Sequence, residues 1–280
     1  MIIEDALERA KRQRQGMART GLHTGDAWRH DPAGAGPVNL EFERIDYDLA
    51  ACEANRIMVP EVEGPDTSAA LTAYRMLRTR VLHRMRHNRW TTLAVTSPGP
   101  GEGKSVTALN VALSMAREKN QNVFLLDLDM NNPSICPYLG IAPRHGIVRF
   151  LAGQVEARDV FFRIGVDRLA IAGGVETTPY SSELLASGRL DVLLDYIRSI
   201  APQPLVVIDL PPVLATDDFL VAATRIDATL LVLCEGKTRR DGVQRTMELL
   251  SGFPIVGVLL NRSHERVVDY YGHRYYSQAQ

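Results

Sequence analysis

The sequence predicts an α/β fold with a mostly parallel sheet and helices on both of its faces. Apolar runs alternate with segments of helical periodicity, the runs are continuous rather than alternating with polar residues, and several end in a carboxylate or an amide. Strands buried on both faces read as continuous apolar runs, and strands that alternate with helices form parallel sheets. The expected strands are 93–95, 122–126, 169–172, 205–209, 228–234 and 255–260.

Helices are expected between these strands. The first covers roughly Thr67 to His87 behind a capping signal at Asp66, and its other face carries arginines, which form a solvated basic face or a contact surface for a neighbouring subunit. Another runs from Ser181 or Ser182, as the cap, to Ile197. The remaining helices are expected after residue 105 and over 146–153, 217–225 and 239–250.

The N-terminal segment predicts a short amphipathic helix over Met1 to Gln15 and a flexible linker over 16–37. The helix either packs on its own domain or docks to a membrane-bound partner or anionic lipid, and its mixed charges leave both open. No apolar run approaches the ~20 residues that span a bilayer, and no secretory signal is expected. The expected organisation is therefore an extension over 1–60, a nucleotide-binding domain over 61–265 and a C-terminal tail over 266–280.

The charge balance and the cysteines limit which partners and which cellular compartment are expected. The 32 basic and 33 acidic residues nearly cancel, so no overall field favours nucleic acid as a partner. The three cysteines, Cys52, Cys136 and Cys234, have no metal-binding spacing and read as free thiols in a reducing cytoplasm.

A glycine-rich stretch from Thr96 to Ser105 lies between the first strand and its helix. Its glycines let successive N–H groups point at one anion, the helix N-terminus adds positive potential, and Lys104 reaches the outer phosphates. Ser105 would hold Mg²⁺ through its hydroxyl. Pro98 replaces the first glycine of the strict pattern, but the Gly-Glu-Gly-Lys-Ser end is intact. The stretch therefore predicts a phosphate-binding loop rather than an ordinary glycine turn.

Carboxylates and an amide follow three of the other strands. Asp127 and Asp129 follow the apolar run of the second strand, and we expect one to face the nucleotide while the other fixes the neighbouring loop. Asp209 closes a four-residue apolar run, which is the form of a Walker B strand beside Mg²⁺. Asn261 ends the last strand, where it either bonds an adenine edge or makes a turn.

The C-terminus carries four of the nine tyrosines in its last twelve residues, outside any periodic element. These are Tyr270, Tyr271, Tyr275 and Tyr276. They pack onto the domain or serve as substrates for phosphorylation, and the clustering favours the second interpretation.

These motifs together resemble the bacterial tyrosine kinases of capsule and exopolysaccharide export, of the CpsD type without a fused membrane region. The resemblance covers roughly Thr72 to the C-terminus. It rests on the phosphate loop, the 127–130 segment, the 208–212 segment and, in the same order, 183–187, 257–261 and the tyrosine tail. It implies a P-loop NTPase fold like that of the partitioning ATPases. Those ATPases usually carry a second lysine where this chain has Gly99, which favours the kinase branch.

The resemblance also implies the chemistry of the site. Lys104 would neutralise the β and γ phosphates of ATP, Ser105 and Asp209 would hold Mg²⁺, Asp129 would support the metal or the loop, and Asp127 would orient or deprotonate the acceptor tyrosine. The nucleotide would lie against Gly99, Pro100, Gly101, Glu102, Gly103, Lys104, Ser105, Val106, Asn261 and Arg262. The implied partners are a transmembrane polysaccharide co-polymerase at the inner membrane, further copies of the chain and a tyrosine phosphatase. The protein would be cytoplasmic and peripheral to that membrane.

The chain departs from the family pattern at three positions. Asn131 stands where arginine is common, Thr72 replaces the glutamate of a Glu-x-x-Arg-x-x-Arg assembly motif, and Cys136 stands where histidine is common. Two other functions therefore stay open beside the autokinase. One is a nucleotide-binding scaffold without kinase chemistry, and the other is an ATPase switch of the partitioning type.

Overall fold

The computed structural model describes residues 38–60, 65–166 and 168–263 of the chain. The chain divides into two units, Met1–Ala35 and Gly36–Gln280, and all described residues belong to the second. The expected N-terminal helix, its linker and the tyrosine tail therefore lie outside the described residues.

The described part of the chain forms one eight-stranded sheet in the order β1-β4-β5-β3-β6-β2-β7-β8. All neighbouring strands are parallel except β4 and β5, so the predicted mostly parallel sheet is confirmed. The strands are β1 (Glu43–Arg44), β2 (Thr92–Thr96), β3 (Val123–Asp127), β4 (Phe161–Arg163), β5 (Leu169–Ala172), β6 (Leu205–Asp209), β7 (Ala228–Cys234) and β8 (Ile255–Asn261).

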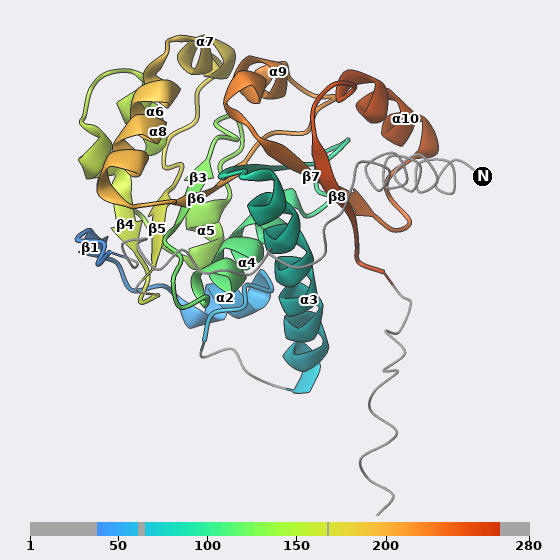
Figure 1. Cartoon of the computed structure of the whole chain (residues 1–280), viewed down its shortest axis with the longest axis horizontal. Helices are drawn as coiled ribbons and strands as arrows, with labels where there is room; N and C mark the ends of the chain where they lie inside the picture. The colour runs from blue at the N-terminus through green and yellow to red at the C-terminus, as the bar shows by residue number, and fades with distance from the viewer. Residues whose placement is uncertain (1–37, 61–64, 167, 264–280) are drawn as a thin grey trace, which may run out of the picture. The chain divides into compact units, whose positions relative to one another are not determined.

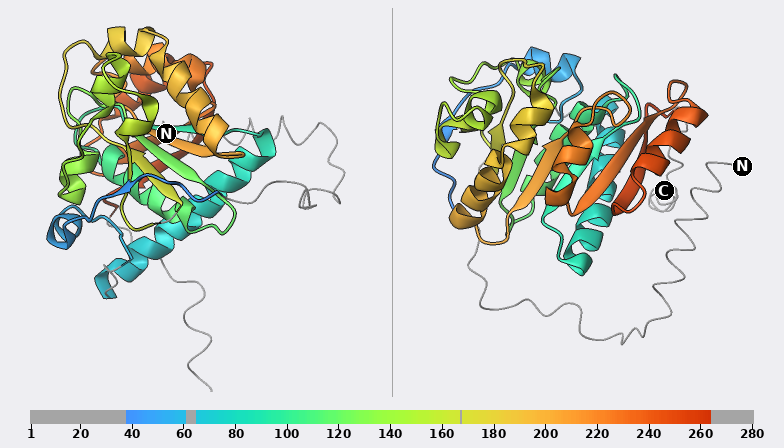
Figure 2. Two further views of the ribbon diagram at one scale, coloured as in Figure 1. Left: turned by 90° about the vertical axis from the view of Figure 1, so that its left-hand side faces the viewer. Right: turned by 90° about the horizontal axis from the view of Figure 1, so that it is seen from above.

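Helices cover both faces of this sheet (Figures 1 and 2). One core lies under α2 (Leu49–Ala54), α3 (Pro65–Asn88), α4 (Lys104–Ala116) and α5 (Ile135–Leu139). The other lies under α6 (Ile147–Leu151), α7 (Ser181–Ala186), α8 (Arg189–Ile200), α9 (Asp218–Ala222) and α10 (Arg240–Leu249). Two 3-10 helices, η1 (Ala157–Val160) and η2 (Ala223–Arg225), complete the described elements.

The strands feed both cores because successive side chains point to opposite faces of a sheet. In β3, Phe124 and Leu126 pack into the core under α6 to α10, whereas Val123 and Leu125 pack into the core under α2 to α5. Every residue of β3 is buried, as a strand covered on both sides requires. This two-sided burial explains why the strands appear in the sequence as continuous apolar runs.

The single helix expected from Ser181 to Ile197 is instead two helices, α7 and α8. The break falls at Ser187 and Gly188, and Gly188 has a φ of +79°, a left-handed conformation that glycine adopts without strain. The expected cap is also wrong. The position before α7 is Tyr180, and the hydroxyls of Ser181 and Ser182 bond to Asp218 rather than to the start of their own helix.

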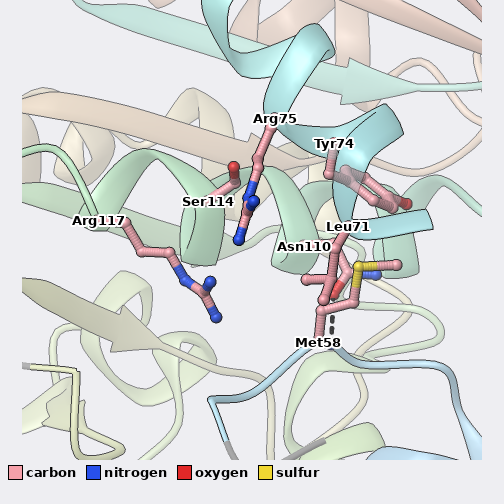
Figure 3. A pocket seen from close by; sticks show the side chains of 7 residues that line it. All are labelled: Met58, Leu71, Tyr74, Arg75, Asn110, Ser114 and Arg117. Carbon is pink, nitrogen blue, oxygen red and sulfur yellow. Dashed lines mark hydrogen bonds between the residues drawn. The ribbon is translucent and has the colours of Figure 1, made fainter. Parts of the chain in front are cut away.

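Residues 38–60 belong to the folded unit, whereas the sequence predicted that the domain begins at residue 61. β1 joins the sheet beside β4, and Ile57 and Val59 are fully buried in the core under α3 and α4. Asn110 of α4 accepts a hydrogen bond of 2.8 Å from the backbone N–H of Met58, which Figure 3 shows. The segment has too little periodicity for its sequence to reveal this packing.

The three cysteines are buried free thiols, as their spacing predicts. Burial, with a contribution from the charge of Asp127, raises the pKa of Cys136 to about 12, so this thiol stays protonated and unreactive. Among the described helices, none combines the length and the apolar character needed to cross a bilayer.

Candidate functional site

Strand register places the predicted acidic residues at the carboxyl ends of neighbouring strands, next to the phosphate loop. Asp209 at the end of β6 lies opposite Val95 of β2 on one side and opposite Asp127 of β3 on the other. The loop leaves β2 directly after this position and enters α4 at Lys104. Carboxyl ends of parallel strands are where open α/β sheets bind ligands.

Two glycines in the phosphate loop adopt conformations that a side chain would disturb. Gly101 and Gly103 have φ angles of +68° and +94°. A methyl group on Gly103 would also collide with the side-chain amide of Asn261. The loop can therefore turn tightly into α4, and its backbone N–H groups are free to face an anion at the helix N-terminus.

Contacts from two other strand ends hold the loop in place. Asn261, at the end of β8, donates to the carbonyl of Glu102 at 2.9 Å and accepts from the N–H of Arg262. Thr238, after β7, donates to the Glu102 carboxylate at 2.8 Å. The observed bonds of Asn261 thus go to backbone groups, while its contact with adenine stays a prediction. Thr238 carried no signal in the sequence, because 136 residues separate it from its partner.

Lys104 is the centre of a buried charge cluster. Its Nζ lies 2.7 Å from Asp129 Oδ2, 3.2 Å from Asp209 Oδ1 and 3.0 Å from the hydroxyl of Ser105. Burial alone would lower the pKa of Lys104, but the charges of Asp209 and Asp129 outweigh it and raise that pKa above its ordinary value. The lysine is therefore positively charged and fixed before any ligand arrives.

The structure distinguishes the two carboxylates at the end of β3. Asp129 contacts Lys104, whereas Asp127 accepts hydrogen bonds of 3.1 Å from the N–H groups of Ser134 and Ile135 and so fixes the start of α5. Burial raises the pKa of Asp127 to about 7, and the neighbouring Asp209 charge adds to that effect. Its other oxygen, Oδ1, is buried and has no hydrogen-bond partner.

The donor set fits a magnesium nucleotide better than a metal held by protein alone. No described group of three or more His, Cys, Asp or Glu residues has an arrangement that holds a metal. Asp209 Oδ2 is a buried oxygen without a hydrogen-bond partner, and the Ser105 hydroxyl contacts both Lys104 and Asp209. Mg²⁺ prefers oxygen ligands and usually keeps several from water and phosphate, so these residues supply what it requires of the protein.

Asn131, the residue at the family's arginine position, is bonded away from the phosphate loop. Its amide donates to Ser181 at 3.2 Å, and Ser181 in turn donates to Asp218 at 2.9 Å. Asp218 is fully buried, and its Oδ2 has no partner. The segment after Asp129 is therefore connected to α7 and α9 through an amide, a hydroxyl and a carboxylate, with no cation in this chain of hydrogen bonds.

The arginines of α3 lie away from the phosphate loop. Arg78 forms an ion pair with Glu118 and donates to the carbonyl of Ser114, so it acts within the chain. Arg75 and Arg117 line a small pocket between α3 and α4 that contains none of the predicted site residues (Figure 3). The basic face of α3 is thus partly used for internal packing.

No protein-family model matches the chain. Tyrosine-protein kinase CpsD of Streptococcus agalactiae is 28% identical over 181 residues, which cover 64% of this chain and 78% of that protein. Tyrosine-protein kinase etk of Escherichia coli K12 is 29% identical over 214 residues, 76% of this chain but 29% of the longer relative. The solved kinase domain of VpsO is 30% identical, with a TM-score of 0.62 over 71% of this chain and 98% of that domain.

Proposed function

Because the chain belongs to the bacterial tyrosine-kinase family, we propose that it transfers the γ-phosphoryl group of ATP to tyrosine hydroxyls, including its own. The observation that carries this proposal is the buried cluster of Lys104 with Asp129 and Asp209 beside a glycine loop. Phosphoryl transfer needs positioning and neutralisation of charge more than covalent chemistry, and this cluster provides both.

Each residue of the cluster takes a distinct task. Lys104 exchanges its carboxylate partners for the β and γ phosphates, while the loop N–H groups bind the same oxygens. Ser105 and Asp209 would hold Mg²⁺, with Asp129 in support, and the ion would supply positive charge to the phosphoryl group that is transferred. Asp127 receives the proton of the tyrosine hydroxyl at Oδ1, the oxygen that its own hydrogen bonds leave free.

The proposed acceptors are Tyr270, Tyr271, Tyr275 and Tyr276, which lie outside the described residues. Their clustering at the end of the chain is what supports this assignment. Transfer to the tail of a neighbouring copy would make the protein a homo-oligomer during the reaction. A tyrosine phosphatase would return it to the unmodified form.

The cellular role that we propose is control of the polymerisation or export of a capsule or another exopolysaccharide. A transmembrane co-polymerase at the inner membrane would be the activating partner, and the kinase would lie on the cytoplasmic side of that membrane. This part of the proposal rests on the family alone. The near balance of charge supports the expectation of no nucleic-acid partner.

Intact-mass spectrometry after incubation with Mg-ATP tests the proposal, with and without the cytoplasmic segment of a candidate activator. We expect phosphate to be added to the tail tyrosines of the wild type and not to Lys104→Met. Substitution of the four tail tyrosines by phenylalanine is the control for acceptor identity. ATP binding without phosphotyrosine, even with the activator, would instead favour the scaffold, which the neutral bonds of Asn131 make the second candidate.

A further inference from the structure

We propose that Lys237, in the loop between β7 and α10, is a second lysine that binds the phosphates of the nucleotide. The inference rests on the proposed function, because it assumes that the glycine loop holds a nucleoside di- or triphosphate. It assigns a ligand contact to a residue that no motif in the sequence marks.

The segment after β7 is folded against the phosphate loop. Thr238 accepts a hydrogen bond of 2.7 Å from the N–H of Cys234 and donates one of 2.8 Å to the carboxylate of Glu102. The N–H groups of Lys237 and Thr238 both donate to the carbonyl of Cys234, at 3.1 and 2.9 Å. This tight turn fixes the backbone of Lys237 relative to the glycine loop.

The ammonium group of Lys237 lies directly over Gly101. A methyl group added to Gly101 would come within 2.5 Å of Lys237 Nζ, closer than real contacts allow. Gly101 has a left-handed φ of +68°, and the end of the flexible Lys237 side chain lies in the space beside it. Nζ therefore reaches the glycine loop, whose backbone N–H groups would bind the phosphates under the proposed function.

Lys237 has no partner for this charge within the described residues. Its side chain is exposed and forms no hydrogen bond or ion pair there, although the Glu102 carboxylate belongs to the loop beneath it. Lys104 differs, since it is buried and shared between two aspartates. A lysine held over a phosphate loop without a protein partner is available to an incoming anion.

The charge of the site also favours a second cation. Four carboxylates, those of Glu102, Asp127, Asp129 and Asp209, are buried at the loop with one lysine among them. A polyphosphate adds further negative charge, which Mg²⁺ and Lys104 must balance against these carboxylates. Lys237 would add positive charge from the exposed side, where the nucleotide enters.

The affinity of the full-length protein for ATP, ADP and AMP is measured by isothermal titration calorimetry at low and moderate salt. We expect Lys237→Met to weaken the binding of ATP and ADP by about tenfold to a hundredfold, as for a lost charge-assisted contact. AMP binding should change much less, the salt dependence of ATP binding should become shallower, and Lys237→Arg should restore most of the affinity. Lys119→Met, an exposed lysine after α4, is the matched control.

Three results would overturn the inference. The first is an unchanged affinity of Lys237→Met for ATP and ADP. The second is an equal loss of affinity for all three nucleotides, which would indicate a role in loop shape or base contact. The third is a lowered unfolding temperature of the ligand-free variant that accounts for the loss of affinity. Failure of the proposed function looks different, because the wild type itself would then bind no nucleotide.

Discussion

Two ion pairs of the same length lie in different regions of the molecule. In the site, Lys104 Nζ lies 2.7 Å from Asp129, with side chains 8% and 5% exposed. On the surface between α8 and η2, Arg225 lies 2.7 Å from Asp191, with side chains 21% and 51% exposed. Distance alone does not separate them, but their surroundings do.

The two pairs differ in the charge and the solvent around them. Lys104 is outnumbered by buried carboxylates, so the cluster keeps unfavourable charge that water would otherwise solvate. The surface pair is solvated and balanced, and such pairs contribute little. Excess buried charge is unfavourable in the ligand-free protein and can be compensated when a ligand binds, as is expected of a functional site.

Lys104→Met should give the largest loss of stability and activity among the four variants. Removal of the lysine leaves Asp129 and Asp209 buried without a cation, which should destabilise the fold by about 3–5 kcal/mol. Phosphotyrosine formation should fall at least about a hundredfold, because an electrostatic contact to the transferring group is lost. Denaturant unfolding at neutral pH and an initial-rate assay measure the two effects, and wild-type stability would show that the cluster is not strained.

Asp209→Asn should separate stability from activity. The change relieves repulsion with Asp127, directly opposite in the sheet, while Lys104 keeps Asp129 as a partner. We expect stability to be unchanged or to rise by about 1 kcal/mol and the rate to fall at least about a hundredfold. A loss of several kcal/mol in urea unfolding would mean that Asp209 supports the fold.

Ser181→Ala should have a smaller effect, because it removes two hydrogen bonds and Ser182 still donates to Asp218. It frees the amide of Asn131 and takes one of two hydroxyl donors from the buried Asp218. We expect the free energy of unfolding to fall by about 1–2 kcal/mol. The rate of phosphoryl transfer should also fall, because the Asp129 segment is held less rigidly. Ser199→Ala, an exposed serine of α8, is the control, and equal behaviour of the two variants would contradict a role for this connection.

Arg225→Ala should give the smallest effect, below about 1 kcal/mol. The hydrogen bond from Arg225 lowers the pKa of Asp191 below its ordinary value. Stability from this pair is therefore present above the unfolded pKa of aspartate and is lost as the pH falls through the lowered folded value. Unfolding curves of wild type and variant should converge in acid, and a difference that grew on acidification would reverse this sign.

Much of the fold was predictable from periodicity. Continuous apolar runs identified β2, β3, β5, β6, β7 and β8, and helical spacing identified α3 and α10. β1 and β4 were missed, because strands of two and three residues are too short to carry a periodic signal. The break between α7 and α8 was missed because leucines continue at helical spacing on both sides of Gly188.

The sequence alone predicts that a glycine loop and three aspartates meet at the carboxyl ends of parallel strands, because chain direction and strand ends are local properties of a β/α alternation. How these groups pair follows from the tertiary structure. Asp129 rather than Asp127 contacts Lys104, Asn131 turns to Ser181 fifty residues away, and Lys237 lies over Gly101. Such pairings depend on side-chain directions and on contacts between segments distant in the chain, which no local pattern of residues encodes.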